Sequence, residues 1–219
     1  MATFDRHLHA RATLFVEGEP SDFIATHTGE VICSDDDGGE TVAGHVRAHR
    51  VHADLAADCG ESLFDVCDSH GHEMHALHGL PFGPDGHMLL PDLVNEYDVF
   101  DSDVLALDSV ILDPKWRGLK IGLLAARKLI DLLGGGCGPV VSEIAPLRRE
   151  AHAKLGVPAD WIPETPSEED HDAVVAKLVG YFTPMGYEPL GKSPYHVLPM
   201  SRRVPTAAEL LRPESFDEE

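Results

Sequence analysis

A short loop over residues 115–122, KWRGLKIG, combines the residue types that bind phosphate groups. Residues 115–129 include five basic side chains and no acidic one, although the whole chain has 38 acidic and 17 basic residues. Gly118 and Gly122 let the backbone approach a ligand closely, and the N–H groups that open a helix attract anions. This local reversal of charge predicts a site for a phosphate-bearing ligand. An ordinary strand-turn-helix unit whose basic residues only face solvent is the alternative.

Two strands and a helix must position this loop. Val104 to Leu112 is a mostly apolar run closed by Asp113-Pro114, which predicts a buried strand. From Ile121 apolar residues recur at helical spacing, so we expect a helix that stops with Gly134 as its C′ residue. Residues 139–144 predict a second buried strand, parallel to the first and reached by a right-handed crossover.

The loop resembles the acetyl-CoA-binding motif of the GNAT superfamily of N-acetyltransferases, which reads Arg/Gln-x-x-Gly-x-Gly/Ala. Arg117-Gly118-Leu119-Lys120-Ile121-Gly122 supplies its first and last positions, with Lys120 where the middle glycine is usual. The run YFTPMGY over residues 181–187 is similar to the aromatic-x-x-x-Gly-aromatic ending of the family's last helix. The resemblance covers about residues 104–200. It implies an α+β fold, an α/β/α sandwich around a mixed, mostly antiparallel sheet with a central βαβ unit and splayed parallel strands.

Acetyl-CoA is the co-substrate that the resemblance implies, and the family motif assigns its binding to residues in and before the turn. These residues are Ile111, Leu112, Arg117, Gly118, Leu119, Lys120, Ile121 and Gly122. Backbone N–H near Ile111 or Leu112, where family members bulge the strand, would stabilise the oxyanion. Lys120 can offer its N–H and its ammonium to a phosphate, provided that its position does not need a positive φ.

Direct attack of an amine on the thioester requires a base for the ammonium proton and a proton for the leaving thiolate. Asp108 lies where some family members carry a carboxylate and is the first candidate base, with a capping or solvent-facing role as the alternative. Glu143 on the next strand is the second candidate. Phe182 stands where the family's acid, a tyrosine, is usual. The candidate acids are Tyr181, Tyr187 and Tyr195.

We therefore expect an acetyl-CoA-dependent N-acetyltransferase that acts on a primary amine of a small molecule or a protein, with a preference for cationic acceptors. A GNAT-like module that binds CoA or a protein without catalysis is the alternative, because Lys120 and Phe182 depart from the family pattern. The sequence does not identify the acceptor.

The residues before the motif predict an antiparallel front to the sheet. Strands are expected at 12–16, 22–26, 31–34 and 41–53, separated by turn residues. The acidic stretch 35–39 lacks the ligand spacing of a calcium loop and is expected to be a solvated turn.

The residues after 164 predict a helix and a closing hairpin. Thr165-Pro166-Ser167-Glu168 has the pattern of a helix start with Thr165 as N-cap, and the helix should end near residues 184–186. Strands over 188–200 and a short helix over 206–211 follow. We expect one domain over residues 1–203 and an acidic C-terminal tail over residues 204–219.

The composition restricts the partners and the compartment. A net charge of −21 makes nucleic acid and anionic membranes poor partners and favours cationic ones. No apolar run approaches the roughly 20 residues of a membrane span, and the first residues do not resemble a signal peptide, so we expect a cytoplasmic protein. The four scattered cysteines predict reduced thiols. The sequence leaves open whether the chain is a monomer or a homodimer.

Eight of the fourteen histidines lie between His45 and His87, which raises the question of a metal site. Residues 61–80 have helical spacing with a break at Gly71, and His72, His75 and His78 recur at intervals of three. A zinc site needs three or four converging ligands, and no further set is evident. We expect a histidine-rich exposed helix and no bound metal.

Overall fold

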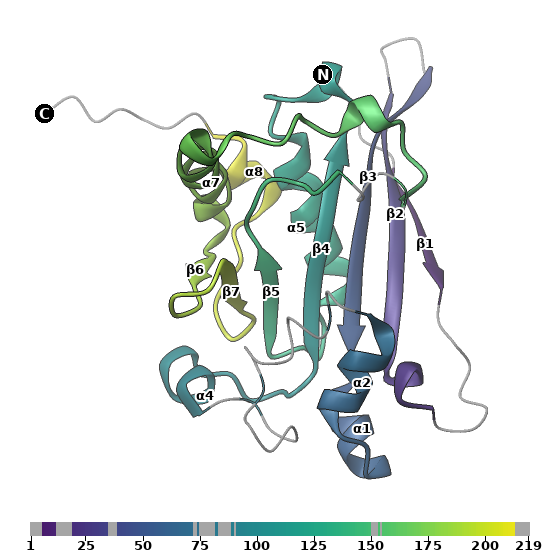
Figure 1. Ribbon diagram of the computed structural model, residues 1–219, viewed down its shortest axis with the longest axis vertical. Helices are drawn as coiled ribbons and strands as arrows, with labels where there is room; N and C mark the ends of the chain where they lie inside the picture. The colour runs from purple at the N-terminus through teal and green to yellow at the C-terminus, as the bar shows by residue number, and fades with distance from the viewer. Residues whose placement is uncertain are drawn as a thin grey trace, which may run out of the picture.

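One open sheet of seven strands forms the centre of the molecule in the computed structural model, which describes residues 6–11, 19–34, 39–71, 74, 82, 89, 91–149, 153 and 155–212. The strands are β1 (Arg6–Arg11), β2 (Ile24–Ser34), β3 (Glu40–Val51), β4 (Val104–Leu112), β5 (Pro139–Glu143), β6 (Glu188–Pro189) and β7 (Tyr195–Pro199). Their order in the sheet is β1-β2-β3-β4-β5-β7-β6 (Figure 1). Only β4 and β5 are parallel; the other neighbours are antiparallel. The chain therefore has an α+β fold with a mostly antiparallel open sheet.

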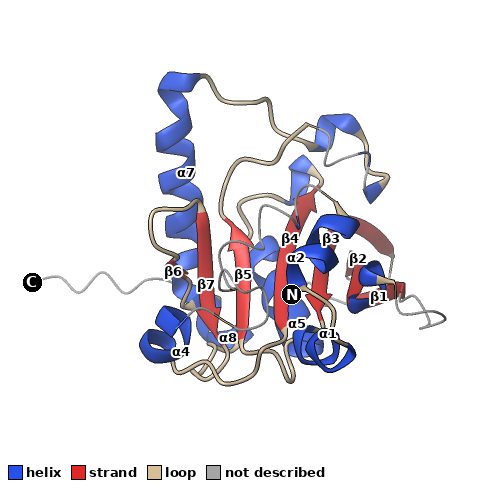
Figure 2. Ribbon diagram, turned by 60° about the horizontal axis from the view of Figure 1, so that its bottom comes forward, coloured by secondary structure: helices blue, strands red, loops and turns tan. Residues whose placement is uncertain are grey.

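Helices cover both faces of this sheet. They are α1 (Ala53–Cys59), α2 (Leu63–His70), α4 (Pro91–Tyr97), α5 (Ile121–Leu133), α7 (Glu168–Phe182) and α8 (Ala207–Leu210), with 3-10 turns η1 (Pro20–Phe23), η2 (Pro114–Trp116), η3 (Ala159–Trp161) and η4 (Thr183–Met185). In Figure 1, α1 and α2 stand in front of the sheet and α5 lies behind β4. In Figures 1 and 2 the segment between β5 and α7 passes over the carboxyl ends of β4 and β5.

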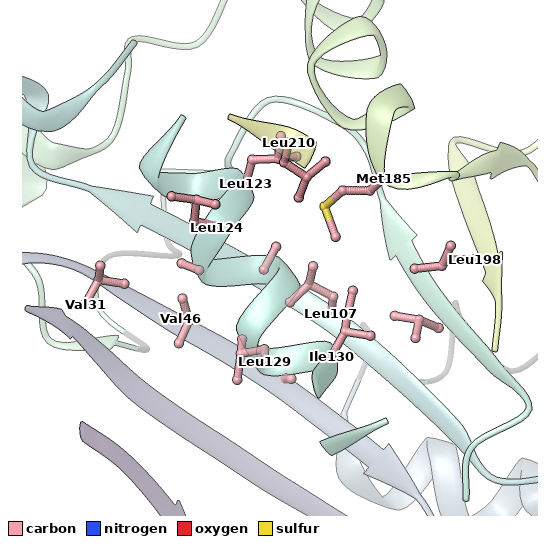
Figure 3. Close-up of a cluster of buried hydrophobic side chains, with 14 of the residues drawn as sticks. Val31, Val46, Leu107, Leu123, Leu124, Leu129, Ile130, Met185, Leu198 and Leu210 are labelled. Carbon is pink, nitrogen blue, oxygen red and sulfur yellow. The ribbon is translucent and has the colours of Figure 1, made fainter. Parts of the chain in front are cut away.

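Successive residues of β4 point to opposite faces of the sheet, so this strand contributes to the hydrophobic core on each face. Leu105 and Leu107 join the core under α5, whereas Val104 and Ala106 join the core under α1, α2 and α4. Figure 3 shows Leu123, Leu129 and Ile130 of α5 among side chains of the sheet. Burying one such aliphatic side chain contributes about 1.5–3 kcal/mol, so this helical face fixes α5, and with it the loop before α5, against β4.

The central βαβ unit matches the expectation from the sequence. The strand Val104–Leu112 and the helix Ile121–Leu133 have the predicted bounds, and β5 is parallel to β4. Gly134 differs in detail, because its φ of −78° is right-handed and the positive φ falls at Gly136. The terminal hairpin and the short helix near residue 207 are confirmed.

The front half differs more from the expectation. The strands predicted over 22–26 and 31–34 are one strand, β2, and η1 precedes it. The predicted strand over 41–53 ends at Val51, where α1 starts, and neither α1 nor α4 was anticipated. Alanine and leucine, which favour helices, make up four of the seven residues of α1, and Gly60 ends it in a left-handed conformation, so the local sequence itself supports this helix. The strand expected at 12–16, residues 35–38 of the acidic turn, and His72, His75 and His78 lie outside the described residues.

Two C-terminal predictions also change. Helix α7 starts two residues later than predicted, with Ser167 as the N-cap that accepts from the Asp170 N–H at 3.2 Å. The part of the predicted acidic tail that the structure describes is packed on α5: Leu210 is 3% exposed and belongs to the core. All four cysteines are free thiols, as expected. In the described part of the chain, no helix is both long and apolar enough to cross a membrane.

Candidate functional site

The parallel strands β4 and β5 separate soon after they meet. They pair only at Leu105 with Val140 and at Ala106 with Val141. One residue further, the Ser142 hydroxyl donates to the Leu107 carbonyl at 3.0 Å, in place of a backbone bond. Beyond that point both strands line a cavity of about 290 Å³, closed on one side by α7 residues such as Leu178 and Phe182. The sheet is therefore open where β4 and β5 end.

A β-bulge in β4 sits at the entrance of this opening. Arg47 of β3 faces Ser109 and Ala48 faces Leu107, which leaves Asp108 without a partner residue in the ladder. The expectation placed a bulge near Ile111 or Leu112, and it is wrong by about three residues. The cavity is lined by residues 107–110 of β4 and does not reach 111 or 112. The backbone of residues 107–110 thus lies at the cavity, and the role expected for Ile111 and Leu112 stays a prediction.

Asp108 has polar neighbours at the bulge. The Ser109 hydroxyl donates to its carboxylate at 3.1 Å, and Arg47 Nε lies 3.9 Å away, a distance for charge attraction without a good hydrogen bond. The side chain is 21% exposed, so it reaches both the cavity and water.

Glu143, the last residue of β5, lines the same cavity from the other strand. Its carboxylate lies 3.5 Å from Arg148 and is one-third exposed. Glu164, on the loop before α7, also contributes to the lining. Every charged side chain among the lining residues is acidic, and most of the others are apolar. The structure thus brings together the two predicted bases, Asp108 and Glu143, in one apolar cavity with negative charge.

The loop after β4 adopts left-handed conformations at two positions. Gly118 has a φ of +77° and Lys120 a φ of +58°. Lys120 was expected to replace the usual glycine only if its position did not need a positive φ. The position does have a positive φ, which costs a non-glycine residue about 1 kcal/mol. Within the described residues, the N–H groups of Leu119 to Gly122 have no hydrogen-bond acceptor, while the Leu124 N–H bonds to the Lys120 carbonyl at 3.1 Å. The start of α5 thus retains open donors.

Both basic side chains of the motif contact backbone carbonyls of the chain itself. Arg117 donates to the Leu112 carbonyl at 3.1 Å and also to the Trp161 carbonyl. Lys120 Nζ donates to the carbonyls of Leu210 at 2.9 Å and Arg212 at 3.3 Å. Neither contact was foreseen. They leave the backbone N–H groups of this loop, more than its basic side chains, available as donors.

Gly122 faces the strand. A Cβ atom there would lie 3.4 Å from the Tyr181 hydroxyl and 3.5 Å from Leu112, in ordinary contact. An alanine would therefore fit here, whereas the larger valine would press against these side chains before it could block a ligand.

Tyr181 reaches the start of α5. Its hydroxyl accepts the Leu123 N–H at 3.0 Å, which leaves the phenol proton for another acceptor. Burial raises the pKa of Tyr181, and the Leu123 hydrogen bond offsets this only partly, so the phenol is protonated at neutral pH. Tyr187, a competing candidate, is only 6% exposed, and burial raises its pKa as well. Phe182 lines the cavity beside Leu178 of the same helix.

The described residues contain no group of three or more His, Cys, Asp or Glu side chains placed to hold a metal.

The role of Ser142 and the bulge in β4 were not predicted from the sequence. Four apolar residues of β4, at positions 105, 107, 110 and 112, face α5. In a regular strand they would recur every two residues, so the three-residue interval from 107 to 110 indicates the extra residue of the bulge.

No family model, no curated protein and no solved structure matches the chain. The geometry of the site is therefore the basis for its interpretation.

Proposed function

We propose that the protein is an acetyl-CoA-dependent N-acetyltransferase of the GNAT type that transfers an acetyl group to a primary amine. One observation carries the proposal: the parallel strands β4 and β5 part after two residue pairs, and a cavity lies in the opening. Val110, which lines that cavity, also faces Gly122 in the first turn of α5. A splayed parallel pair is what the resemblance at residues 104–200 implies.

The cofactor half of the proposal uses the loop before α5. The pyrophosphate of acetyl-CoA would accept hydrogen bonds from the backbone N–H groups of residues 119–122, at the positive end of the helix dipole. The pantetheine arm would enter the opening between β4 and β5 past Val110 and Phe182. Its thioester would then lie near the bulge at Asp108.

The chemistry uses carboxylates of the cavity lining and Tyr181 at the start of α5. Asp108 removes a proton from the bound ammonium, directly or through water, with Glu143 as the second candidate. The amine nitrogen attacks the thioester carbon, and backbone N–H in 107–110 stabilises the oxyanion. The C–S bond then breaks, and Tyr181 donates a proton to the leaving thiolate. The products are an N-acetylated amine and CoA.

The acceptor is a primary amine on a small molecule or a protein. Carboxylates at Asp108, Glu143 and Glu164 favour an ammonium group, and the apolar lining favours an acceptor with an aliphatic or aromatic body. The net charge of −21 acts in the same direction.

A second candidate, a module that binds CoA without transferring the acetyl group, is favoured by one observation. Arg117 and Lys120 are held by backbone carbonyls of their own chain and are not offered to a ligand. The two functions share the binding step and differ in turnover.

Calorimetric titration of the chain with acetyl-CoA, followed by thiol release with a panel of primary amines, tests both candidates. Binding with one-to-one stoichiometry and amine-dependent release of CoA supports the transferase. Binding without turnover supports the second candidate. Absence of binding removes both.

A further inference from the structure

Three polar side chains meet on the face of the sheet that α2 covers. Thr26 of β2 and His49 of β3 are paired across the two strands, and His70 is the last residue of α2. Thr26 Oγ1 lies 3.0 Å from His49 Nδ1 and 3.2 Å from His70 Nε2. The two ring nitrogens are themselves 3.2 Å apart. Three atoms that carry lone pairs thus form a small triangle, distinct from the cavity between β4 and β5.

Hydrogen bonds account for two of the three contacts in this triangle. Each imidazole nitrogen has a single in-plane position, which holds either a proton or a lone pair. His49 Nδ1 faces two partners that are only 3.2 Å from each other, so it cannot point at both, and the same holds for His70 Nε2. Any assignment of protons leaves at least one of the three contacts bent or shared.

One cation above the triangle would use all three lone pairs at once. Ligand atoms at about 2.0–2.1 Å from a tetrahedral zinc ion lie about 3.3 Å from one another. The observed separations of 3.0–3.2 Å are close to this value. Neutral imidazole is a preferred ligand of Zn²⁺ and related divalent ions, and a hydroxyl with a water molecule can complete the coordination.

We propose that His49 Nδ1, His70 Nε2 and Thr26 Oγ1 form a binding site for a divalent transition-metal ion of the Zn²⁺ type. The setting supports this assignment. His49 is 2% exposed and held in the sheet, while Thr26 and His70 are half-buried, so the site is rigid on one side and accessible on the other. The imidazole rings meet edge-on, with centroids 4.9 Å apart and planes at 76°.

Metal binding at this place would connect α2 to β2 and β3. His70 ends α2, whereas Thr26 and His49 lie within the sheet. The metal would stabilise the folded chain by mass action, because the unfolded chain does not hold the three donors together.

The test compares metal stoichiometry in the whole chain and in matched variants. Zn²⁺ titration by calorimetry and Co²⁺ absorption in the visible range are measured for the wild type, His70→Gln, His49→Gln and Thr26→Val. His27→Gln is the control, because His27 is the next residue on β2 and projects from the other face. The difference between proteins is the readout, since the chain has fourteen histidines and other sites contribute equally to each variant.

We expect the wild type and His27→Gln to bind one more equivalent of Zn²⁺ than His70→Gln and His49→Gln, and to show an intense Co²⁺ band typical of four-coordination. Thr26→Val should keep that equivalent with about tenfold weaker affinity. Equal stoichiometry in the wild type and His70→Gln overturns the proposal. If His49→Gln does not fold by circular dichroism, His70→Gln decides, because His70 is half-exposed at a helix end.

Discussion

Asp108 reaches the cavity because β4 contains one residue more than β3 across the ladder. The bulge removes it from strand pairing, and its carboxylate is free to accept from Ser109 and to attract Arg47. Bulges are common beside active sites, where they re-aim a side chain. The proposed base is thus positioned by a backbone irregularity.

The first prediction concerns Asp108. Asp108→Asn preserves the shape and removes the proton acceptor, so kcat/KM for an amine should fall by about 10²–10⁴ while acetyl-CoA affinity is unchanged. Steady-state kinetics and calorimetry measure the two quantities. Glu164→Gln, a change of the same kind in the same cavity lining, should lower kcat/KM far less than Asp108→Asn, because it removes only attraction for the ammonium group. Normal turnover in Asp108→Asn with loss in Glu143→Gln would place the base on β5.

Asp103 joins β3, β4 and the end of α5. Arg50 donates to its carboxylate at 2.9 and 3.2 Å, and the same guanidinium donates to the Gly135 carbonyl at 2.9 Å. His52 Nδ1 lies 3.3 Å from the same carboxylate oxygen. Burial alone would raise the pKa of Asp103, but the hydrogen bonds from His52 and Arg50 outweigh burial and lower it below its ordinary value of 3.8.

The second prediction follows from this shift. Asp103→Asn should lower the free energy of unfolding by about 1.5–3 kcal/mol at pH 7, because hydrogen bonds to a charged group are lost. The contribution is fully present above pH 3.8 and disappears as pH falls toward the lower pKa of the folded state. The wild type and the variant should therefore converge below about pH 4 in urea titrations. Asp101→Asn, an exposed neighbour, is the control; a pH-independent difference contradicts the assignment.

At the scale of elements, the loop and α5 act as one unit. The apolar face of α5 fixes the helix on the sheet, and Gly118 turns the loop so that its N–H groups stay open.

The third prediction concerns Gly118→Ala. A Cβ atom there meets nothing within 4 Å, so the substitution should lower the free energy of unfolding by about 1 kcal/mol, through backbone strain only. Acetyl-CoA affinity should also fall. Gly60→Ala has a similar φ of +80° and open space, and should lose stability without losing affinity.

Helix α8 is a small element with a structural role. Its N-cap Thr206 and Glu209 form a capping box, and its Leu210 carbonyl accepts a hydrogen bond from Lys120.

The fourth prediction is that Leu210→Ala lowers the free energy of unfolding by about 2–4 kcal/mol, because Leu210 is 3% exposed in the core. Leu211→Ala, at 49% exposure, should change it by less than about 0.5 kcal/mol. Equal effects in chemical denaturation would show that α8 is not packed.

At the scale of the whole molecule, charge is the dominant feature. The net charge of −21 surrounds a cavity whose charged lining is acidic, so a cationic acceptor is drawn to it over a range set by ionic strength. The fifth prediction is that kcat/KM for a cationic amine falls as salt rises, with kcat little changed, at saturating acetyl-CoA. An amine that also carries a carboxylate should show a weaker dependence. A rate that rises with salt contradicts electrostatic steering.

The sequence by itself determined the local elements around the loop. Apolar residues at the period of a strand and then of a helix, closed by Pro114 and by the glycines after Leu133, specify β4 and α5 within a short stretch. Capping residues and turn glycines act over three or four residues, so the hairpin and α8 could also be predicted.

Tertiary structure alone decided how those elements meet. The separation of β4 from β5, the contacts of Arg117 with Trp161 and of Lys120 with Leu210, and the meeting of Thr26, His49 and His70 join residues 21 to 90 positions apart. How these distant segments meet depends on the space that each leaves for the others. A local sequence pattern does not contain that information.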